Sequence, residues 1–165
     1  MEESLADITA LDGVKLSEDP LESFKKYQDE YIFGKLLSPT YGENTCQVEL
    51  EVLTGYPVYN MPGNAYTDYI DGRVDSLVSL YKNSGYVTYV YHPNTVFFNR
   101  SYVYNSMGFD NIKFKDDFEL ELKRISNWSD DETLFDNIIY DYENRDVEKP
   151  FLAFVVTTQN HGGYD

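Results

Sequence analysis

An uninterrupted apolar run near the end of the chain places the strongest constraint on its fold. Residues 150–157 read Pro-Phe-Leu-Ala-Phe-Val-Val-Thr and carry no charge. Such a run is typical of a β-strand that is covered on both faces. Strands of this kind belong to parallel sheets whose connecting helices pack on either side, so the run predicts an α/β protein.

Helical and strand patterns alternate along the rest of the chain. One helix is predicted to begin at Asp19-Pro-Leu-Glu22, and a second to run through Val74, Leu77, Val78 and Tyr81 as far as Gly85. A third is predicted to begin at Ser129-Asp-Asp-Glu132. Its buried side would carry Leu134, Phe135, Ile138, Ile139 and Tyr142. Strands are predicted at residues 32–37 and 86–91, and a loop at 57–64. We therefore expect one domain piece over residues 1–165, a sandwich with a mainly parallel central sheet flanked by helices.

The charge of the chain excludes one class of partner. With 29 acidic against 13 basic side chains, the formal net charge is −16, and nucleic acids are bound chiefly through Lys and Arg. Cations are the easier partners, although most acidic side chains on such a surface simply maintain solubility. A single cysteine, Cys46, excludes an internal disulfide framework. We see no membrane-spanning run, and the acidic start Met1-Glu-Glu-Ser does not fit a signal peptide.

Thr45 is the candidate nucleophile, because a loop carrying Gly42 delivers its hydroxyl to a predicted helix start. Unpaired N–H groups and the helix dipole favour negative charge at such a position, which suits a phosphoryl group and a threonine alkoxide. A purely structural helix cap is the alternative for the same residue.

Three candidate positions follow predicted strands, where functional residues of parallel sheets gather. Thr45 follows the strand at 32–37, His92 follows the strand at 86–91, and Asn160-His161 follows the apolar run. We therefore expect these side chains to share one edge of the sheet.

Four ordered segments resemble the lipoteichoic acid synthase family of the alkaline phosphatase and sulfatase superfamily. The segment Gly42-Glu-Asn-Thr-Cys-Gln-Val-Glu-Leu-Glu-Val-Leu-Thr-Gly55 is similar to its nucleophile motif, with Thr45, Glu49 and Glu51 in register. The other segments are Met1-Glu-Glu-Ser-Leu-Ala-Asp7, Gly85 to Arg100, and Lys149 to Asp165. The resemblance therefore extends from end to end of the chain.

The same resemblance implies that the catalytic domain is incomplete at both ends. Family members have a buried strand before the first segment and an Asp-His pair beyond the last. They also carry transmembrane helices ahead of an extracellular catalytic domain. The implied location is thus the cell membrane, reached through segments missing from this chain, and the isolated chain is expected to be inactive.

The resemblance further implies a metal-dependent mechanism. Glu3 and Thr45 would hold a divalent cation, Mn²⁺ or alternatively Mg²⁺, with the missing Asp-His pair. Thr45 would attack the phosphodiester of a lipid such as phosphatidylglycerol and pass glycerophosphate to a growing polymer or to water. Arg100, His161, His92 and Phe98 match substrate-binding positions, so the expected partner is an anionic phospholipid headgroup or a glycerophosphate polymer.

Other interpretations of these residues stay open. Glu3 can be a solvated charge, Arg100 can pair at a helix start, and His92-Pro93 can simply turn the chain. Cys46 lacks the Pro and Arg of the sulfatase maturation motif, so formylglycine chemistry is not expected. The alternative functions are a phosphate or sulfate ester hydrolase of the same fold and a noncatalytic module that binds glycans or teichoic polymers.

Overall fold

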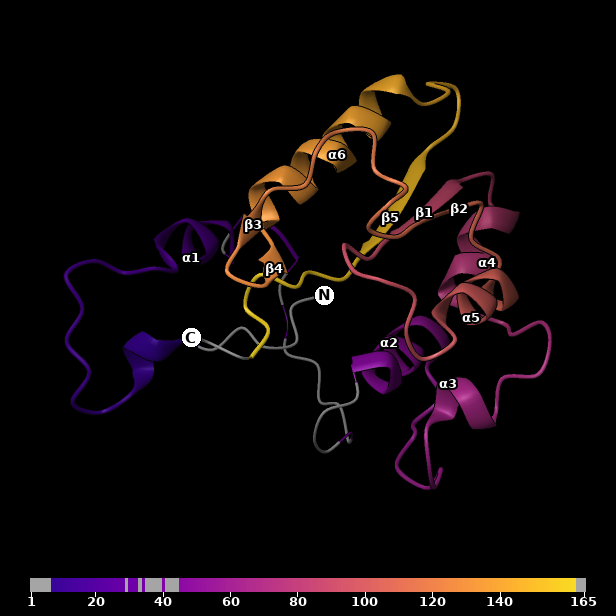
Figure 1. Cartoon of the computed structure of the whole chain (residues 1–165), viewed down its shortest axis with the longest axis horizontal. Coiled ribbons are helices and arrows are strands. Elements are labelled where there is room, and N and C mark those ends of the chain that lie inside the picture. Colours follow the sequence, from indigo (N-terminus) through magenta and orange to yellow (C-terminus); the bar gives the residue numbers. More distant parts are fainter. Residues whose placement is uncertain (1–6, 29, 33, 35–39, 41–44, 163–165) are drawn as a thin grey trace.

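A three-stranded parallel sheet forms the centre of the computed structural model, which describes residues 7–28, 30–32, 34, 40 and 45–162 (Figure 1). Its strands are β1 (Val87–Tyr91), β2 (Asn111–Lys113) and β5 (Phe151–Val155), in the order β2-β1-β5. Tyr89 is in register with Asn111 on one side and with Ala153 on the other. The parallel sheet predicted from the apolar run is therefore confirmed.

One face of the sheet is covered by α6 (Asp131–Asn144). Side chains alternate between faces along a strand, so Tyr89 and Tyr91 share this side. The Tyr91 hydroxyl donates to Asp141 Oδ2 at 3.0 Å, and Lys113 Nζ lies 2.8 Å from Asp141 Oδ1. These contacts join α6 to β1 and β2.

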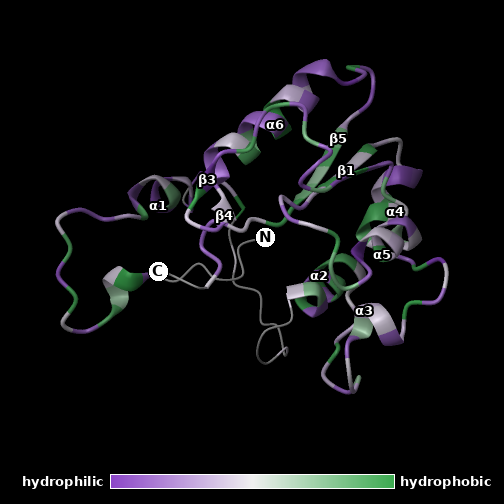
Figure 2. Cartoon of the chain, viewed as in Figure 1, coloured by the Kyte–Doolittle hydropathy of each residue, from purple (hydrophilic) through white to green (hydrophobic). Residues whose placement is uncertain are grey.

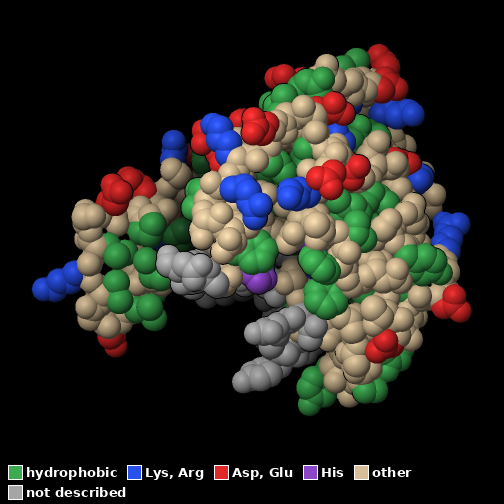
Figure 3. All heavy atoms as spheres, viewed as in Figure 1, with side chains coloured by type: hydrophobic (Ala, Val, Ile, Leu, Met, Phe, Trp, Pro, Cys, Tyr) green, Lys and Arg blue, Asp and Glu red, His purple; other side chains and the backbone are tan. Residues whose placement is uncertain are grey.

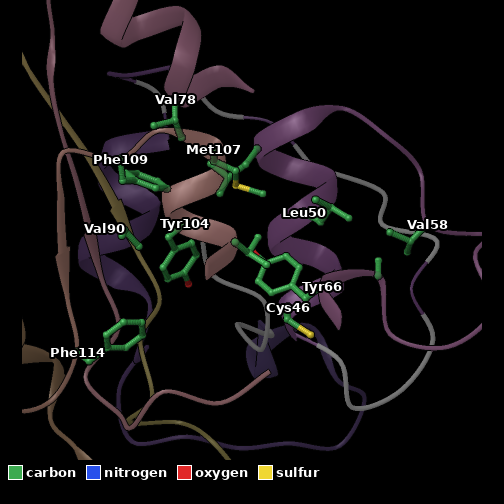
Figure 4. Packing of buried hydrophobic residues seen from close by; sticks show 13 residues of the cluster. Cys46, Leu50, Val58, Tyr66, Val78, Val90, Tyr104, Met107, Phe109 and Phe114 are labelled. Carbon is green, nitrogen blue, oxygen red and sulfur yellow. The ribbon is translucent and has the colours of Figure 1, made fainter. Parts of the chain in front are cut away.

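The opposite face carries the main hydrophobic core. It lies between the sheet and α2 (Thr45–Thr54), α3 (Ala65–Asp68), α4 (Leu77–Asn83) and α5 (Arg100–Met107). Figure 4 shows Tyr104 and Met107 of α5 between Val90 of the sheet and Leu50 of α2. Each fully buried side chain of this size contributes about 1.5–3 kcal/mol of transfer free energy. The core thus packs α2 and α5 on the same face of the sheet.

The remaining elements are short. The 3₁₀-helix η1 (Ile8–Ala10) and α1 (Glu22–Gln28) lie to one side of the sheet in Figure 1, and Lys25 links them through ion pairs with Asp7 and Asp19. The strands β3 (Arg124–Ile125) and β4 (Trp128–Ser129) form an antiparallel hairpin just before α6. The sequence patterns did not predict this hairpin or α3, because segments this short carry no recognisable period.

Several predicted element boundaries are confirmed. The helix predicted at Asp19 is α1, and Asp19 Oδ1 accepts from Leu21 N. β1 matches the strand predicted at 86–91 to within one residue, and α4 ends just before Gly85, whose φ of +90° favours glycine. Val74, however, lies before this helix, because the Ser76 side chain caps its start. The strand predicted at 32–37 lies mostly outside the described residues, and neither Ile32 nor Gly34 is in a strand.

Two predictions about α6 are wrong, one of them only in part. Its N-cap is Asp130, which accepts from Thr133 N at 2.8 Å, whereas the Ser129 hydroxyl donates to the carbonyl of Pro93. The predicted buried face is right only in part: Leu134 is buried and Ile138 half-buried, but Phe135, Ile139 and Tyr142 are exposed, and the other buried residues are Thr133 and Asn137. The reason is that Asn137 bonds the backbone of Leu120, which draws the polar side of the helix inward. Figure 2 shows the resulting mixture of hydrophobic and hydrophilic residues along α6.

The apolar run at 150–157 is less buried than predicted. All residues of β5 are half-buried. Within the described part of the chain β5 pairs with β1 alone, so its second edge has no strand against it. No helix among the described residues is long and apolar enough to cross a bilayer.

Candidate functional site

The carboxyl ends of β1 and β5 bring candidate residues to one edge of the sheet. The two strands are parallel neighbours, so the segments after Tyr91 and after Val155 leave the sheet side by side. His92 begins the first of these segments and His161 lies in the second. Val156 N donates to the carbonyl of Tyr91, which keeps the two segments together beyond the sheet. This part of the predicted arrangement is confirmed.

Thr45 is the first residue of α2, as predicted, and is half-buried. The first N–H groups of a helix have no partner within it, so the hydroxyl lies where anions are favoured. The first turns of α2 and α5 contain no acidic residue, although the chain is strongly acidic overall. The positive ends of these two helix dipoles are therefore not neutralised from within their own first turns.

A buried ion pair connects the starts of the two helices. Arg100, the first residue of α5, directs Nη2 to Glu49 Oε1 at 2.7 Å and Nε to the same oxygen at 3.1 Å. Glu49 is 0% exposed and Arg100 is 4% exposed. The hydroxyls of Tyr66 and Tyr104 donate to Glu49 Oε2 at 3.0 and 2.7 Å. We call Glu49, Tyr66, Arg100 and Tyr104 the buried network.

The protonation states of the buried network follow from its surroundings. Burial raises the pKa of both Tyr66 and Tyr104 well above the usual range, and the charge of Glu49 raises each further. Burial by itself lowers the pKa of Arg100, but the Glu49 carboxylate more than offsets this, so that pKa is raised. At neutral pH the tyrosines are therefore hydrogen-bond donors and Arg100 is charged.

The residues just before Arg100 adopt an unusual backbone. Phe98 and Asn99 both have positive φ, 56° and 58°, although neither is glycine. This conformation is costly for an aromatic residue, and such strain is found mainly at functional sites. It leaves the Phe98 ring 46% exposed, 5.5 Å from Arg100 Cζ. Phe98 is thus an accessible aromatic surface beside the buried guanidinium.

His92 is buried rather than open to a ligand. It is 5% exposed, its ring meets Phe114 edge to face, and its Nδ1 has no hydrogen-bond partner among the described residues. Burial lowers the pKa of His92 to about 4, and the charge of Arg100 acts in the same direction. The imidazole is therefore neutral at physiological pH.

His161, by contrast, is exposed. Its ring lies 4.2 Å from the ring of Trp128 in β4, an aromatic contact that the sequence patterns did not single out. Trp128 is the only tryptophan of the chain, which is the one signal that might have drawn notice. Figure 3 shows histidine atoms at the surface near the middle of this face, beside hydrophobic side chains.

The described residues do not form a metal site by themselves. Glu3 lies outside the described residues, and no group of three or more His, Cys, Asp or Glu side chains occurs among those that the structure describes. Of the ligands implied by the resemblance, Thr45 is thus the one that the structure places.

Sequence reasoning also left part of the buried network without a role. Glu49 matches the nucleophile motif and Tyr104 matches a position just beyond the Gly85 to Arg100 segment, but neither match gives a role, and no pattern points to Tyr66. The available signal was the spacing of Glu49 from Thr45, which puts both on one face of α2. For Arg100, the structural alternative of pairing at a helix start is observed, because its Nε and Nη2 both donate to Glu49.

Comparisons with known proteins agree with this architecture. A model of the Sulfatase family matches residues 1–165. The chain is 36% identical over 168 residues to a putative cyclic beta-1,2-glucan modification protein of Rhizobium meliloti (strain 1021). That match covers all of this chain and 25% of the relative, so the chain spans a quarter of the relative's length.

Solved structures resemble the fold as well. The phosphoglycerol transferase GacH of Streptococcus pyogenes, in complex with sn-glycerol-1-phosphate, is 25% identical with a TM-score of 0.71, over 87% of this chain and 39% of that one. The lipoteichoic acid synthase LtaP of Listeria monocytogenes is 23% identical with a TM-score of 0.63, over 75% and 30%. A protein of the alkaline phosphatase superfamily from Vibrio parahaemolyticus is 25% identical with a TM-score of 0.60, over 74% and 30%.

Proposed function

This chain belongs to the Sulfatase family, and on that premise we propose that it is the Thr45-bearing part of a metal-dependent phosphoglycerol transferase. The family is one of enzymes, and the expected likeness to lipoteichoic acid synthases is confirmed. Members of the superfamily are generally metal-dependent. The activity, the substrate and the partners of a longer protein are our proposals.

The observation that carries the proposal is the junction of two helix starts. Thr45 begins α2 and Arg100 begins α5, and the Glu49–Arg100 pair joins the two helices one turn from Thr45. Two dipole ends, one hydroxyl and one guanidinium at one junction suit a phosphoryl group. This arrangement supports an oxygen nucleophile acting on a phosphate ester.

The proposed reaction has two steps that use the same threonine. Thr45 Oγ loses its proton and bonds to the phosphorus of a phosphatidylglycerol-like diester, while the bond from phosphorus to the diacylglycerol oxygen breaks and that oxygen takes up a proton. In the second step, an acceptor hydroxyl loses its proton and attacks the phosphorus. The bond to Thr45 Oγ then breaks, and the threonine regains a proton.

A divalent cation, Mn²⁺ in the first instance and Mg²⁺ as the alternative, would be held by Glu3 and Thr45 together with ligands from outside this chain. Hard oxygen ligands suit these ions, and the bound ion lowers the pKa of a coordinated hydroxyl. The described residues do not complete such a site, so the roles of the side chains around Thr45 are assigned without the cation.

We assign roles to the surrounding side chains according to their exposure to solvent. Arg100 would direct N–H groups at the phosphate, and Phe98 would pack against the glycerol part of the headgroup. The exposed His161, on the Trp128 ring, would donate a hydrogen bond or move a proton to the leaving oxygen. His92 would pack behind these side chains as a neutral ring.

The donor and acceptor are proposed from chemistry and similarity. An anionic phospholipid headgroup suits the Thr45 hydroxyl and the Arg100 guanidinium. A growing glycerophosphate chain is the acceptor suggested by the likeness to LtaP, and a glucan hydroxyl is the acceptor suggested by the 36% identity to the Rhizobium protein. Either acceptor places the reaction in the cell envelope, outside the membrane.

The test is Thr45→Ala in a polypeptide that carries residues 1–165 within a complete sulfatase domain. We expect turnover of phosphatidylglycerol with Mn²⁺ to fall by about 10³-fold or more, because the nucleophile is lost. The control is Thr54→Ala at the other end of α2, where the hydroxyl donates to the carbonyl of Leu50. A covalent adduct of glycerophosphate mass on Thr45 should be found by mass spectrometry.

Other outcomes select other functions. Release of glycerophosphate to water at the same rate with and without an acceptor would indicate the hydrolase. Unchanged turnover in Thr45→Ala would contradict the nucleophile, and binding of teichoic polymer with no turnover in either protein would indicate the noncatalytic module.

A further inference from the structure

The Glu49 carboxylate accepts hydrogen bonds from every other member of the buried network. Its partners are Arg100 Nε and Nη2 and the hydroxyls of Tyr66 and Tyr104. We propose that Glu49 is a positioning residue, which fixes the plane of the Arg100 guanidinium so that its remaining N–H groups point at the phosphate of a bound glycerophosphate headgroup. This inference rests on the proposed function, because it assigns Arg100 to the phosphate.

Geometry places this contact next to the candidate nucleophile. Glu49 follows Thr45 by four residues, so the two side chains are neighbours on one face of α2. Glu49 engages the Nε and Nη2 edge of Arg100. The two groups on that edge do not account for all five donors of a guanidinium. The remaining donors of Arg100 are thus held in one orientation by the contact with Glu49.

Stability alone is a poor reason for such a pair. Both charges are taken out of water, and that desolvation often exceeds the attraction between them. The two buried hydroxyls also need an acceptor, which a pair of phenylalanines in their place would not. The network sits beside apolar core residues such as Cys46 and Val103, where nonpolar side chains would pack at less cost. A role for the oriented guanidinium accounts for the arrangement.

The charges of Glu49 and Arg100 distinguish a positioning role from simple attraction of the phosphate. Glu49 and Arg100 together are neutral, so the pair does not attract phosphate through net charge. If Glu49 becomes neutral, the positive charge of Arg100 is no longer compensated and should by itself favour an anion. Positioning predicts the opposite sign, because a guanidinium free to rotate loses the alignment of its donors. The two effects can therefore be told apart by the direction of the change in affinity.

The experiment measures binding of sn-glycerol-1-phosphate to a polypeptide that carries residues 1–165 within a complete sulfatase domain and to its Glu49→Gln variant, with the ¹⁵N signals of the Arg100 side chain followed by NMR. We expect separate Nη1 and Nη2 signals in the wild type, because rotation is blocked, and one averaged signal in Glu49→Gln. We expect the variant to bind the ligand at least about fivefold more weakly, the loss typical of one well-aligned charged hydrogen bond. The ligand should shift the Arg100 signals of the wild type.

The matched control is Glu51→Gln, a neighbour on α2 whose carboxylate accepts from Val58 N outside the buried network. It should leave both affinity and the Arg100 signals within error of the wild type. If Glu49→Gln does not fold, Glu49→Asp keeps the charge but shortens the side chain, and the same weakening and signal averaging are expected.

Two results would overturn the inference in distinguishable ways. If the wild type binds and the Glu49 variants bind equally or more tightly, Glu49 does not position Arg100, although the proposed phosphate site stands. If the wild type does not bind and its Arg100 signals do not shift, the phosphate site itself is wrong, and this role for Glu49 falls with it.

Discussion

His92 and the Glu49–Arg100 pair show how individual residues respond to the same buried environment in opposite ways. The Arg100 guanidinium lies 2.7 Å from the Glu49 carboxylate, whose charge raises the pKa of Arg100. His92 has no such partner: its Nδ1 bonds no described residue, and burial lowers its pKa to about 4. One imidazole therefore couples the stability of the molecule to pH.

We predict that His92 makes the protein less stable as the pH falls from 6.5 to 4. In this range the unfolded chain binds a proton at His92, with the ordinary pKa of 6.5, whereas the folded chain does not. The free energy of unfolding should fall by up to about 3 kcal/mol from this residue, with no contribution above pH 6.5. Urea unfolding at pH 7.0 and 4.5 measures the change.

Carboxylates titrate over part of the same range, so a variant separates their effect. Asp7, Asp19, Asp110 and Asp130 all have lowered pKa values, because hydrogen bonds to their charged forms outweigh the penalty of burial. Protonation of these aspartates in acid also lowers the free energy of unfolding of the protein. In His92→Gln the loss between pH 7.0 and 4.5 should shrink to the carboxylate part. An equal loss in wild type and variant would show that His92 is protonated in the fold.

At the level of elements, the positions where helices begin carry most of the organisation of the site. α2 begins at Thr45 and α5 at Arg100, while α6 begins after Asp130, which holds the hairpin and helix together. The Asp130 carboxylate accepts from the backbone N–H and the hydroxyl of Thr133. α6 in turn braces β1 and β2 through Asp141.

We predict that Asp130→Ala destabilises the protein by about 1–2 kcal/mol, the usual cost of losing an N-cap. The free energy of unfolding in urea at pH 7 is the measurement. Asp136→Ala is the control, because this aspartate lies on the exposed side of the same helix and should change stability by less than about 0.5 kcal/mol. Equal effects of the two substitutions would contradict the capping role.

Elements with a clear period were predictable from the sequence, and contacts between distant elements were not. The start of α2, the strand β1 and the apolar strand β5 follow from local patterns. The buried side of α6 was predicted correctly at Leu134 but not at Phe135, because the period defines faces but does not show that Asn137 would bond Leu120. The buried network joins positions 49, 66, 100 and 104, and no local pattern reveals such a pairing. The placement of Glu3 lies outside the described residues and stays a prediction.

On the scale of the whole molecule, an acidic surface surrounds a core built mainly on one face of the sheet. Acidic side chains are spread over the face shown in Figure 3, and the formal net charge is −16. Like charges repel in the compact state, which lowers stability until salt screens them. The fold therefore depends on ionic strength as well as on its core.

We predict that the midpoint of thermal unfolding at pH 7 rises when NaCl increases from about 10 to 200 mM, because the screening length falls from roughly 30 Å to under 10 Å. Differential scanning calorimetry measures the shift. Near the isoelectric point the net charge vanishes, and the same salt step should have little effect. A midpoint that falls with salt at pH 7 would mean that attractive ion pairs outweigh the repulsion.

The buried pair of Glu49 and Arg100 has a consequence for protein engineering. Varying these two positions one at a time lowers the free energy of unfolding in most clones, since each replacement strands the other charge in the core. The four codons of the buried network are better treated as a single locus, with Glu49 and Arg100 exchanged together for nonpolar residues of similar volume and both tyrosines for phenylalanine. Clones from such a library should retain the fold while losing the oriented guanidinium, and a screen would then score ligand capture without scoring misfolding.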